Sequence, residues 1–370
     1  SWSAQTEISP MVISRAEGSH VWDGAGKRYL DFTSQLVFTN LGHQHPRVVE
    51  AIQRQATTLC TVAPAHVNDA RSEAARLIAE RMPEGIEKVF FTNGGADANE
   101  HAIRMARLHT GRHKVLAAYR SYHGGTAGAM ALTGEPRRWG SEPSLPGIVH
   151  HWGPYPYRSP FHSDSPEQEC ERALAHLREV VEVEGPQHVA AIVLETVVGT
   201  NGVLVPPDGY LAGVRTLCDE HGIVMIADEV MAGFGRVGEW FAVDRWGITP
   251  DLITFAKGVN SGYVPLGDSG VWVPGPDTVA KSARPASDTT TDPEADQGGG
   301  TSNDVFHVNY RQLEGLANNH DQQAEQVAQW ANAEQDFADR FLATHGKIAY
   351  ATYLNVKKFN DSRQAEAGAY

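Results

Sequence analysis

The chain of 370 residues is 41% apolar and 21% charged, with a net charge of −14. These values predict a globular protein with a large core and two domains, and the acidic balance argues against nucleic acid or an anionic membrane as the main partner. No apolar run approaches the roughly 20 residues that a membrane span needs, and residues 1–7 lack the basic start and apolar core of a signal peptide.

The first elements expected along the chain are a hairpin over residues 19–32 and two amphipathic helices over about 46–59 and 69–81. Beyond them, short apolar runs alternate with helical segments. The expected strands are 88–91, 114–117, 189–194, 223–227 and 252–255, and the expected helices between them are about 96–109, 167–183 and 210–221. This alternation predicts an α/β fold with a mainly parallel sheet that helices cover on both faces.

After Gly267 the pattern weakens. Residues 284–304 are typical of a loop or linker, and 318–342 is rich in Asn, Gln and Ala. The latter range has a few large apolar residues at helical spacing, which favours a modest core face over a site.

The cysteines and histidines show no pattern typical of redox or metal chemistry. Cys60, Cys170 and Cys218 are far apart and form no C-x-x-C pair, which is typical of reduced thiols in a cytoplasmic protein. His43 and His45 have a metal-like spacing but no third ligand. We therefore expect a cytoplasmic location and no metal.

Ligands of parallel sheets bind beyond the carboxyl ends of the strands, and a phosphate-type turn falls there. The stretch Asn93–Glu100 follows an expected strand and opens a helix. Its glycines allow an anion to approach the backbone, and the free N–H groups at the helix start favour a phosphate. The alternative is an ordinary turn between a strand and a helix.

Three further positions suggest a flat cofactor. Asp228 ends a buried strand, where a carboxylate is costly unless partnered, and a pyridinium nitrogen would be such a partner. Tyr122 could stack on the ring and Val230 could pack on its other face. Lys257 closes the next apolar segment and can form a Schiff base with an aldehyde. Taken singly, Tyr122 fits a surface loop and Lys257 a solvated strand end; together they indicate pyridoxal phosphate.

One motif points to another cofactor. Gly233–Gly238 matches the G-x-G-x-x-G pattern and follows a strand. Residues 228–232 intervene, however, and residues 239–244 are a poor helix start, so we do not expect a dinucleotide site. No G-x-S-x-G or Walker sequence occurs in the chain.

Taken together, these motifs resemble those of the class III pyridoxal-phosphate aminotransferases, the ω-transaminases of fold type I. The resemblance covers roughly residues 1–267, and within the family it is strongest to the taurine–pyruvate and β-alanine–pyruvate group. The segments that match in order are Leu41–Pro46, Gly94–Glu100, Tyr122–Gly124, Glu195–Gly199, Asp228–Arg236 and Phe255–Gly258.

The resemblance implies roles for individual residues. Lys257 would be the catalytic lysine that forms the Schiff base, and Asp228 the catalytic partner of the pyridine nitrogen. Trp2 and Gln35 correspond to substrate-pocket positions. The remaining cofactor contacts implied are Gly95 and Ala96 at the phosphate, Tyr122, His123 and Val230 around the ring, and Glu195 near Asp228.

The chain also departs from the family pattern. Gly94-Gly95-Ala96 stands where the family often has Ser-Gly-Thr, and Thr196 stands where it prefers proline. The segment Gly-Gly-x-Thr-Tyr-Ser-Gly-His-Pro, whose threonine reaches the phosphate in the partner subunit, is not found after Lys257. Gly299–Ser302 is only a faint echo of it.

The resemblance further implies a homodimer that transfers an amino group from an ω-amino acid or amine to a keto acid such as pyruvate. An aminomutase, racemase or decarboxylase of the same fold shares the residues named, and a non-catalytic relative is a further alternative. We expect residues 1–50 to belong to a smaller α+β domain with the substrate pocket, 51–267 to form the large cofactor domain, and 268–370 to form a poorly matched C-terminal region.

Overall fold

The structure is a computed structural model that describes residues 10–63 and 65–272. All of these belong to one compact unit. Trp2 and the segments expected at 284–304 and 318–342 lie outside the described residues.

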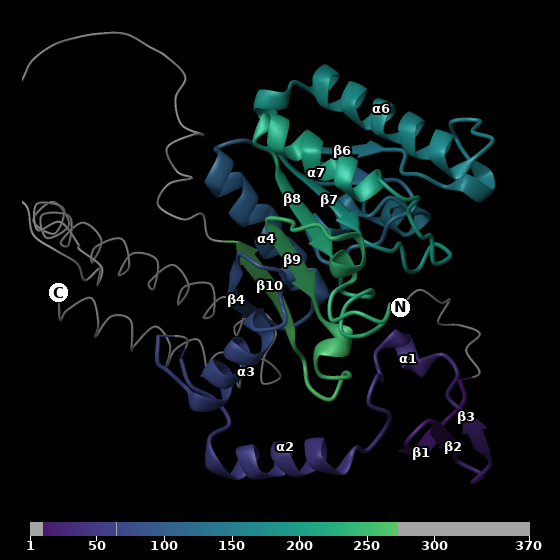
Figure 1. Cartoon of the computed structure of the whole chain (residues 1–370). Coiled ribbons are helices and arrows are strands. Elements are labelled where there is room, and N and C mark those ends of the chain that lie inside the picture. Colours follow the sequence, from purple (N-terminus) through teal and green to yellow (C-terminus); the bar gives the residue numbers. More distant parts are fainter. Residues whose placement is uncertain (1–9, 64, 273–370) are drawn as a thin grey trace, which may run out of the picture. The chain divides into compact units, whose positions relative to one another are not determined.

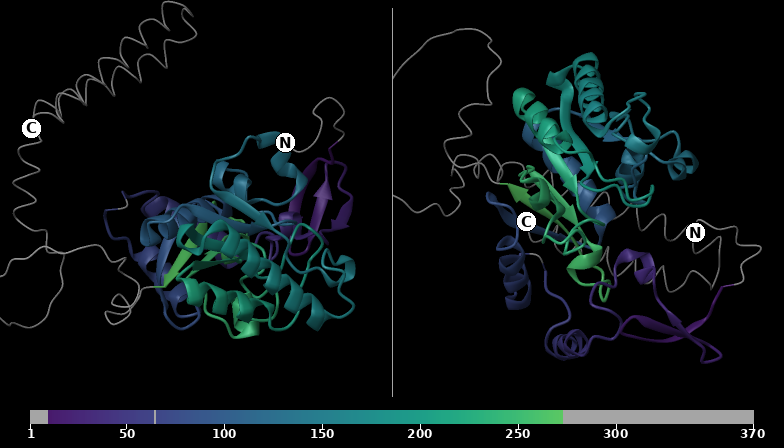
Figure 2. Two further views of the ribbon diagram at one scale, coloured as in Figure 1. Left: turned by 90° about the horizontal axis from the view of Figure 1, so that it is seen from above. Right: turned by 45° about the vertical axis from the view of Figure 1, so that its right-hand side comes forward.

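The N-terminal part of the described chain forms a small antiparallel sheet, coloured purple in Figure 2. Its strands are β1 (Ile13–Glu17), β2 (His20–Asp23) and β3 (Arg28–Leu30). The predicted hairpin is confirmed by the β2–β3 pair, and Asp23 Oδ1 stabilises its turn by accepting from the N–H groups of Ala25 and Lys27, both at 2.9 Å. β1 was not predicted, because its five residues carry a single large apolar side chain and no alternation.

A seven-stranded sheet with the order β4-β10-β9-β8-β7-β5-β6 forms the centre of the fold (Figure 1). All pairs from β9 to β6 are parallel, whereas β10 runs antiparallel to both of its neighbours. The predicted mainly parallel sheet is therefore confirmed. The strands are β4 (Ile86–Thr92), β5 (Lys114–Ala118), β6 (Ile148–His151), β7 (Val189–Glu195), β8 (Val224–Asp228), β9 (Leu252–Phe255) and β10 (Gly267–Trp272).

Between β4 and β8, α-helices alternate with the strands along the chain. Five α-helices of the described chain match the predictions to within a few residues, namely α2, α3, α4, α6 and α7. The α-helices are α1 (Ser34–Val37), α2 (Pro46–Thr58), α3 (Asp69–Ala79), α4 (Gly95–Thr110), α5 (Ala127–Leu132), α6 (Pro166–Glu184) and α7 (Tyr210–His221). Short 3-10 turns are η2 (Pro136–Ser141), η3 (Pro156–Arg158), η4 (Pro186–His188), η5 (Ala242–Trp246) and η6 (Lys257–Val259). Among the described helices, none is long and apolar enough to cross a bilayer.

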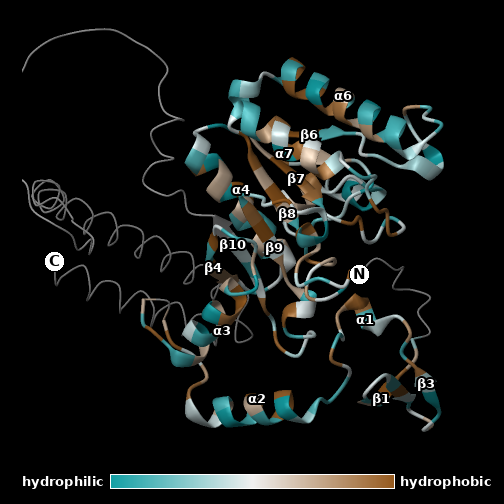
Figure 3. Cartoon of the chain, in the orientation of Figure 1, coloured by the Kyte–Doolittle hydropathy of each residue, from teal (hydrophilic) through white to brown (hydrophobic). Residues whose placement is uncertain are grey.

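Helices cover the central sheet on both faces, as predicted. In β7, Ile192 and Leu194 join the cluster that contains residues of α6 and α7, whereas the alternate residues Ala191 and Val193 join the cluster that contains residues of α4. β7 and β8 are hydrophobic along most of their length, while α6 carries both hydrophilic and hydrophobic residues (Figure 3). A strand that is apolar on both sides is typical of a parallel sheet between two helical layers.

Strand register brings polar residues to one edge of this sheet. Glu195 at the end of β7 pairs with Asp228 at the end of β8, and Asp228 pairs with Thr254 in β9. Lys257 follows β9 within two residues. The carboxyl ends of three neighbouring strands therefore place these four residues together.

One further buried acid, Asp268 in β10, pairs with Phe255, the last residue of β9. Its Oδ1 accepts from the N–H of Phe90 at 3.0 Å, and its Oδ2 is buried without a hydrogen-bond partner among the described residues. Burial raises the pKa of Asp268 to about 7.

The change Asp268→Asn tests the cost of this acid. The unfolded chain releases the Asp268 proton near pH 3.8 and the folded chain near pH 7, so ionisation removes stability as the pH rises between these values, and the whole cost is present above pH 7. We expect the variant to raise the free energy of unfolding above pH 7 by about 1–3 kcal/mol and to flatten its pH dependence below. Urea denaturation over a pH series measures both, and Asp164→Asn, at an exposed position, is the control. Parallel pH curves for the Asp268 variant and the unchanged protein would contradict the expectation.

Candidate active site

A cavity of about 240 Å³ lies at the carboxyl edge of the sheet. Eight of its lining residues were predicted from the sequence: Gly95, Ala96, Tyr122, His123, Glu195, Asp228, Val230 and Lys257. The other five are Gly124, Gly125, Thr200, Met231 and Ala256. Gln35 is not among the lining residues; its side chain donates to Asp31 at 2.9 Å instead.

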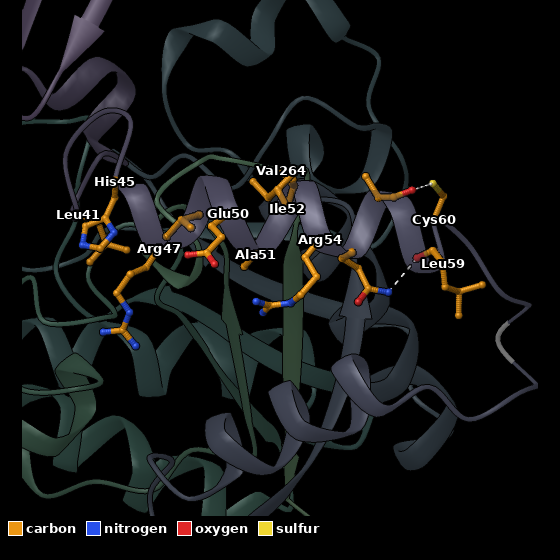
Figure 4. Close-up of a pocket in the computed structure, with 13 residues that line it drawn as sticks. Leu41, His45, Arg47, Glu50, Ala51, Ile52, Arg54, Leu59, Cys60 and Val264 are labelled. Carbon is orange, nitrogen blue, oxygen red and sulfur yellow. Dashed lines mark hydrogen bonds between the residues drawn. The ribbon is translucent and has the colours of Figure 1, made fainter.

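A larger hollow of about 1040 Å³ runs along α2 but shares no residue with this cavity (Figure 4). It is lined mainly by α2, together with Leu41, His45, Leu59, Cys60 and Val264. Since α2 buries none of its residues, the hollow is open space beside a helix that the described residues leave uncovered. The smaller cavity, where charged groups converge, is the better candidate for chemistry.

Asp228 is held by donors from three different elements. Its Oδ2 accepts from Asn99 Nδ2 of α4 at 2.8 Å and lies 2.7 Å from His123 Nδ1, while its Oδ1 accepts from the N–H of Val230 at 3.0 Å. Asn99 Oδ1 in turn accepts from Thr254 Oγ1 at 2.7 Å. Because all these groups are buried apart from Val230, they fix the position of the carboxylate.

The surroundings of His123, which lies beside Asp228, favour its protonated form. Burial alone would lower the pKa of His123, but the hydrogen bond to Asp228 and the charges of Asp228 and Glu195 raise it overall. His123 Nε2 is buried without a hydrogen-bond partner among the described residues. A protonated His123 would leave Asp228 and His123 as a nearly neutral pair at the cavity wall.

Glu195 connects the cavity wall to two loops. Its Oε1 accepts from the N–H of Tyr122 at 2.8 Å and its Oε2 from the N–H of Gly199 at 2.7 Å. Burial raises the pKa of Glu195, against the opposing charge of His123. The carboxylate therefore fixes the backbone that carries the Tyr122 ring.

Lys257 is placed to react rather than to form an ion pair. It lies in η6 with a φ of 31°, and its amine makes no hydrogen bond to any described residue. Burial lowers its pKa, the charges of Asp228 and Glu195 oppose this effect, and the net shift is downward. A lysine of this kind has a larger neutral, nucleophilic fraction than a solvated one.

The start of α4 forms the other wall and fits an anion. The first helical hydrogen bond of α4 runs from the N–H of Ala98 to the carbonyl of Gly94, so the N–H groups of Gly95 and Ala96 have no acceptor within the helix. A Cβ at Gly95 would lie 2.6 Å and 2.8 Å from the two methyl groups of Val230. Glycine at this position is thus required for the close approach of α4 to the loop after Asp228.

The other motifs raised by the sequence do not form sites among the described residues. His43 lies 2.8 Å from Asp31, and the N–H of His45 donates to the hydroxyl of Tyr263. No group of three potential metal ligands converges within residues 10–63 and 65–272. Gly233–Gly238 forms turns, and the short η5 rather than an α-helix follows it.

Two supporting residues, Asn99 and Thr254, were missed by the sequence interpretation. Asn99 carried one usable signal, since it lies next to the buried Ala98 and Ala102 face of α4, where a polar residue needs a partner. Thr254 carried none, because threonine is common in strands.

Comparison with known proteins identifies the family. A sequence model of the class III aminotransferases matches residues 2–291. An acetylornithine aminotransferase of Methanopyrus kandleri is 38% identical over 259 residues, which cover 70% of this chain and 61% of that protein. The chain thus spans about three fifths of the length of the curated relatives it matches.

Solved structures give the same result. A taurine:2-oxoglutarate aminotransferase from Bifidobacterium kashiwanohense, in complex with PLP and glutamate, is 47% identical with a TM-score of 0.71, covering 73% of this chain and 61% of that one. An (S)-enantioselective ω-transaminase from Thermomicrobium roseum is 38% identical with the same TM-score, covering 76% and 65%. The expected fold type I architecture is therefore confirmed.

The contact between Asn99 and Asp228 leads to a stability prediction. The change Asn99→Ala leaves the Asp228 carboxylate and the Thr254 hydroxyl each with one fewer partner in a buried region. We expect the free energy of unfolding to fall by about 1–3 kcal/mol, measured by urea denaturation of the cofactor-free protein. Thr254→Val removes only the hydroxyl and should cost less than Asn99→Ala. A loss from Asn99→Ala no larger than that from Thr254→Val would contradict the central role of Asn99.

Proposed function

The chain belongs to the class III aminotransferases, and from this premise we propose that the protein transfers an amino group from an ω-amino acid or amine to a keto acid. The family depends on pyridoxal phosphate, and one related structure contains it. The single observation that carries the proposal is that Lys257 and Asp228, from adjacent strand ends, line the same cavity.

The residues present fit this cofactor. The uncapped N–H groups of Gly95 and Ala96 suit its phosphate, and Tyr122 and Val230 would flank its ring. Asp228 would accept a hydrogen bond from the ring nitrogen. When bound, pyridoxal phosphate supplies an aldehyde that reacts with amines and a ring that accepts electrons as the bond to a neighbouring hydrogen breaks.

The protein supplies the base for this reaction. With the cofactor bound, the neutral Lys257 Nζ would take a proton from the substrate carbon beside the amino nitrogen and return it to the carbon on the other side of that nitrogen. Its lowered pKa, caused first by burial, keeps a fraction of the amine neutral. Asp228 would hold a positive charge at the ring nitrogen, which would make loss of that substrate proton easier.

We further propose a homodimer in the cytoplasm. The family resemblance supports the dimer, since family sites are completed across the subunit interface. All three cysteines, Cys60, Cys170 and Cys218, are free thiols, which supports a reducing compartment. Gln35 and Trp2 stay proposed substrate-pocket residues, the second outside the described residues.

The change Lys257→Ala removes the reactive amine. We expect loss of amino transfer from β-alanine or taurine to pyruvate or 2-oxoglutarate, by about a hundredfold or more, and loss of the visible absorbance band of bound cofactor. Spectra of the purified protein before and after donor addition, with product assays, measure both effects.

Lys88→Ala, at an exposed position of β4, is the matched control and should keep both signals. Undiminished transfer by the Lys257 variant would refute the proposed mechanism. Turnover of an amino acid without any added keto acid would instead favour an aminomutase, racemase or decarboxylase.

A further inference from the structure

The segment Ser34–Val37 is held in an unfavourable backbone conformation. Ser34, Gln35 and Val37 have φ angles of 49°, 58° and 60°, a region that residues other than glycine rarely occupy and that β-branched residues such as Val37 avoid most. Such a conformation persists only where the surroundings impose it. The contacts that hold this segment are therefore informative.

Arg236 supplies two of these contacts. Its Nη2 donates to the carbonyl of Val37 and to Asn40 Oδ1, both at 2.7 Å, and its Nε donates to the carbonyl of Met231 at 3.2 Å. Asn40 Nδ2 donates onward to the carbonyl of Phe234 at 3.1 Å. We call Asn40 and Arg236 the clamp, because together they join residues 34–40 to the loop that follows Asp228.

The clamp lies directly against the turn that carries Lys257. A Cβ at Gly258 would lie 2.7 Å from Asn40 Nδ2 and 2.8 Å from Phe234 Cβ, so the chain after Lys257 packs on the clamp only because Gly258 has no side chain. Lys257 itself has a positive φ of 31°. Lys257, whose backbone is strained, is thus followed by Gly258, and Gly258 packs tightly against the clamp.

The clamp also contributes charge. Four charged groups act on the Lys257 amine besides its burial, which is the largest cause of its lowered pKa: Asp228 and Glu195 raise the pKa, and Arg236 and Arg137 lower it. The two carboxylates come from strand ends, Arg137 comes from η2, and Arg236 comes from the loop after β8. Of the two arginines, Arg236 is the one bonded to Asn40.

We propose that Arg236 is a positioning residue for Lys257: with Asn40 it fixes the backbone at Lys257 and Gly258, and it places a positive charge near the turn that carries Lys257. The inference rests on the proposed function, in which Lys257 is the reactive amine. Both effects favour the reactive state, because a fixed backbone directs Nζ into the cavity and a nearby cation disfavours its protonation.

The test measures the reactivity of Lys257 itself. The full 370-residue protein, stripped of cofactor, is treated with pyridoxal phosphate and cyanoborohydride over a series of pH values, and the modified Lys257 peptide is quantified by mass spectrometry. Arg236→Gln removes the charge, so the pH midpoint of trapping should move upward and the trapping rate at neutral pH should fall. Arg236→Lys restores the charge and should return the midpoint to that of the unchanged protein.

Two further variants distinguish a positioning role of the clamp from a general loss of local structure. Asn40→Ala breaks the clamp without a change of charge, so it should lower the limiting trapping rate and leave the midpoint in place. Ser261→Ala removes a different contact of the same segment, the hydrogen bond from the N–H of Leu41 at 3.0 Å, and should change neither quantity. Thermal denaturation verifies that each variant is folded.

An unmoved midpoint in folded Arg236→Gln, or an equal shift in Ser261→Ala, would overturn the inference. Should Arg236→Gln fail to fold, Arg236→Lys and Asn40→Ala still decide the inference. A shift of the trapping midpoint in either variant would refute it, and so would an unchanged limiting trapping rate in Asn40→Ala. Failure of the proposed function is distinguishable, because a protein whose Lys257 responds as expected but that transfers no amino group retains the clamp and loses only the aminotransferase assignment.

Discussion

The buried carboxylate of Asp228 fixes the positions of the elements around the cavity. Removing a carboxylate from water is costly unless hydrogen bonds compensate for the loss, and here the donors come from separate elements: Asn99 on α4, His123 after β5, and the N–H of Val230. Satisfying Asp228 therefore fixes α4, β8 and the loop after β5 relative to one another. The walls of the cavity are consequently determined by the chain itself.

Lys257 shows how the fold balances charge around a reactive amine. The parallel register of β7, β8 and β9 brings Glu195 and Asp228 to the strand edge beside it, and two carboxylates alone would stabilise the ammonium form. Burial and two arginines, Arg137 in η2 and Arg236 in the loop after β8, act in the opposite direction, and the net pKa shift is downward. The strands supply the acids and the segments between strands supply the compensating cations, so the reactivity of the lysine depends on both.

The sequence was sufficient to predict elements and site residues wherever the signal lies in a short stretch of chain. Periodicity located α4, α6 and the apolar strands, and the residues at and after the strand ends, together with the family resemblance, identified eight members of the cavity. It was insufficient where partners are distant: Asn99 meets Asp228 across 129 positions and Arg236 meets Asn40 across 196. The β10 strand was missed because Asp268-Ser269-Gly270 is polar and small, and α5 because its six residues have no polar face.

Three acids near this edge, the buried Asp228 and Glu229 and the partly buried Glu195, have different tasks. Glu229 accepts from the N–H groups of Ala242 and Val243 at 2.6 Å and 2.7 Å and from the Thr196 hydroxyl at 2.9 Å, a bond that the proline preferred by the family at this position could not provide. Burial nevertheless raises the pKa of Glu229 to about 7, and it does not line the cavity.

Asp228 does line the cavity, and its Oδ1 accepts from only one described donor, the N–H of Val230. A carboxylate oxygen has room for two hydrogen bonds. Glu195 also lines the cavity, and each of its oxygens likewise accepts from one N–H group, that of Tyr122 or that of Gly199, which shape the loops around the site. Of the three acids, Asp228 is the one that donors from three elements hold at the cavity, and we propose it as the partner of a ring nitrogen, while the other two maintain the walls that surround it.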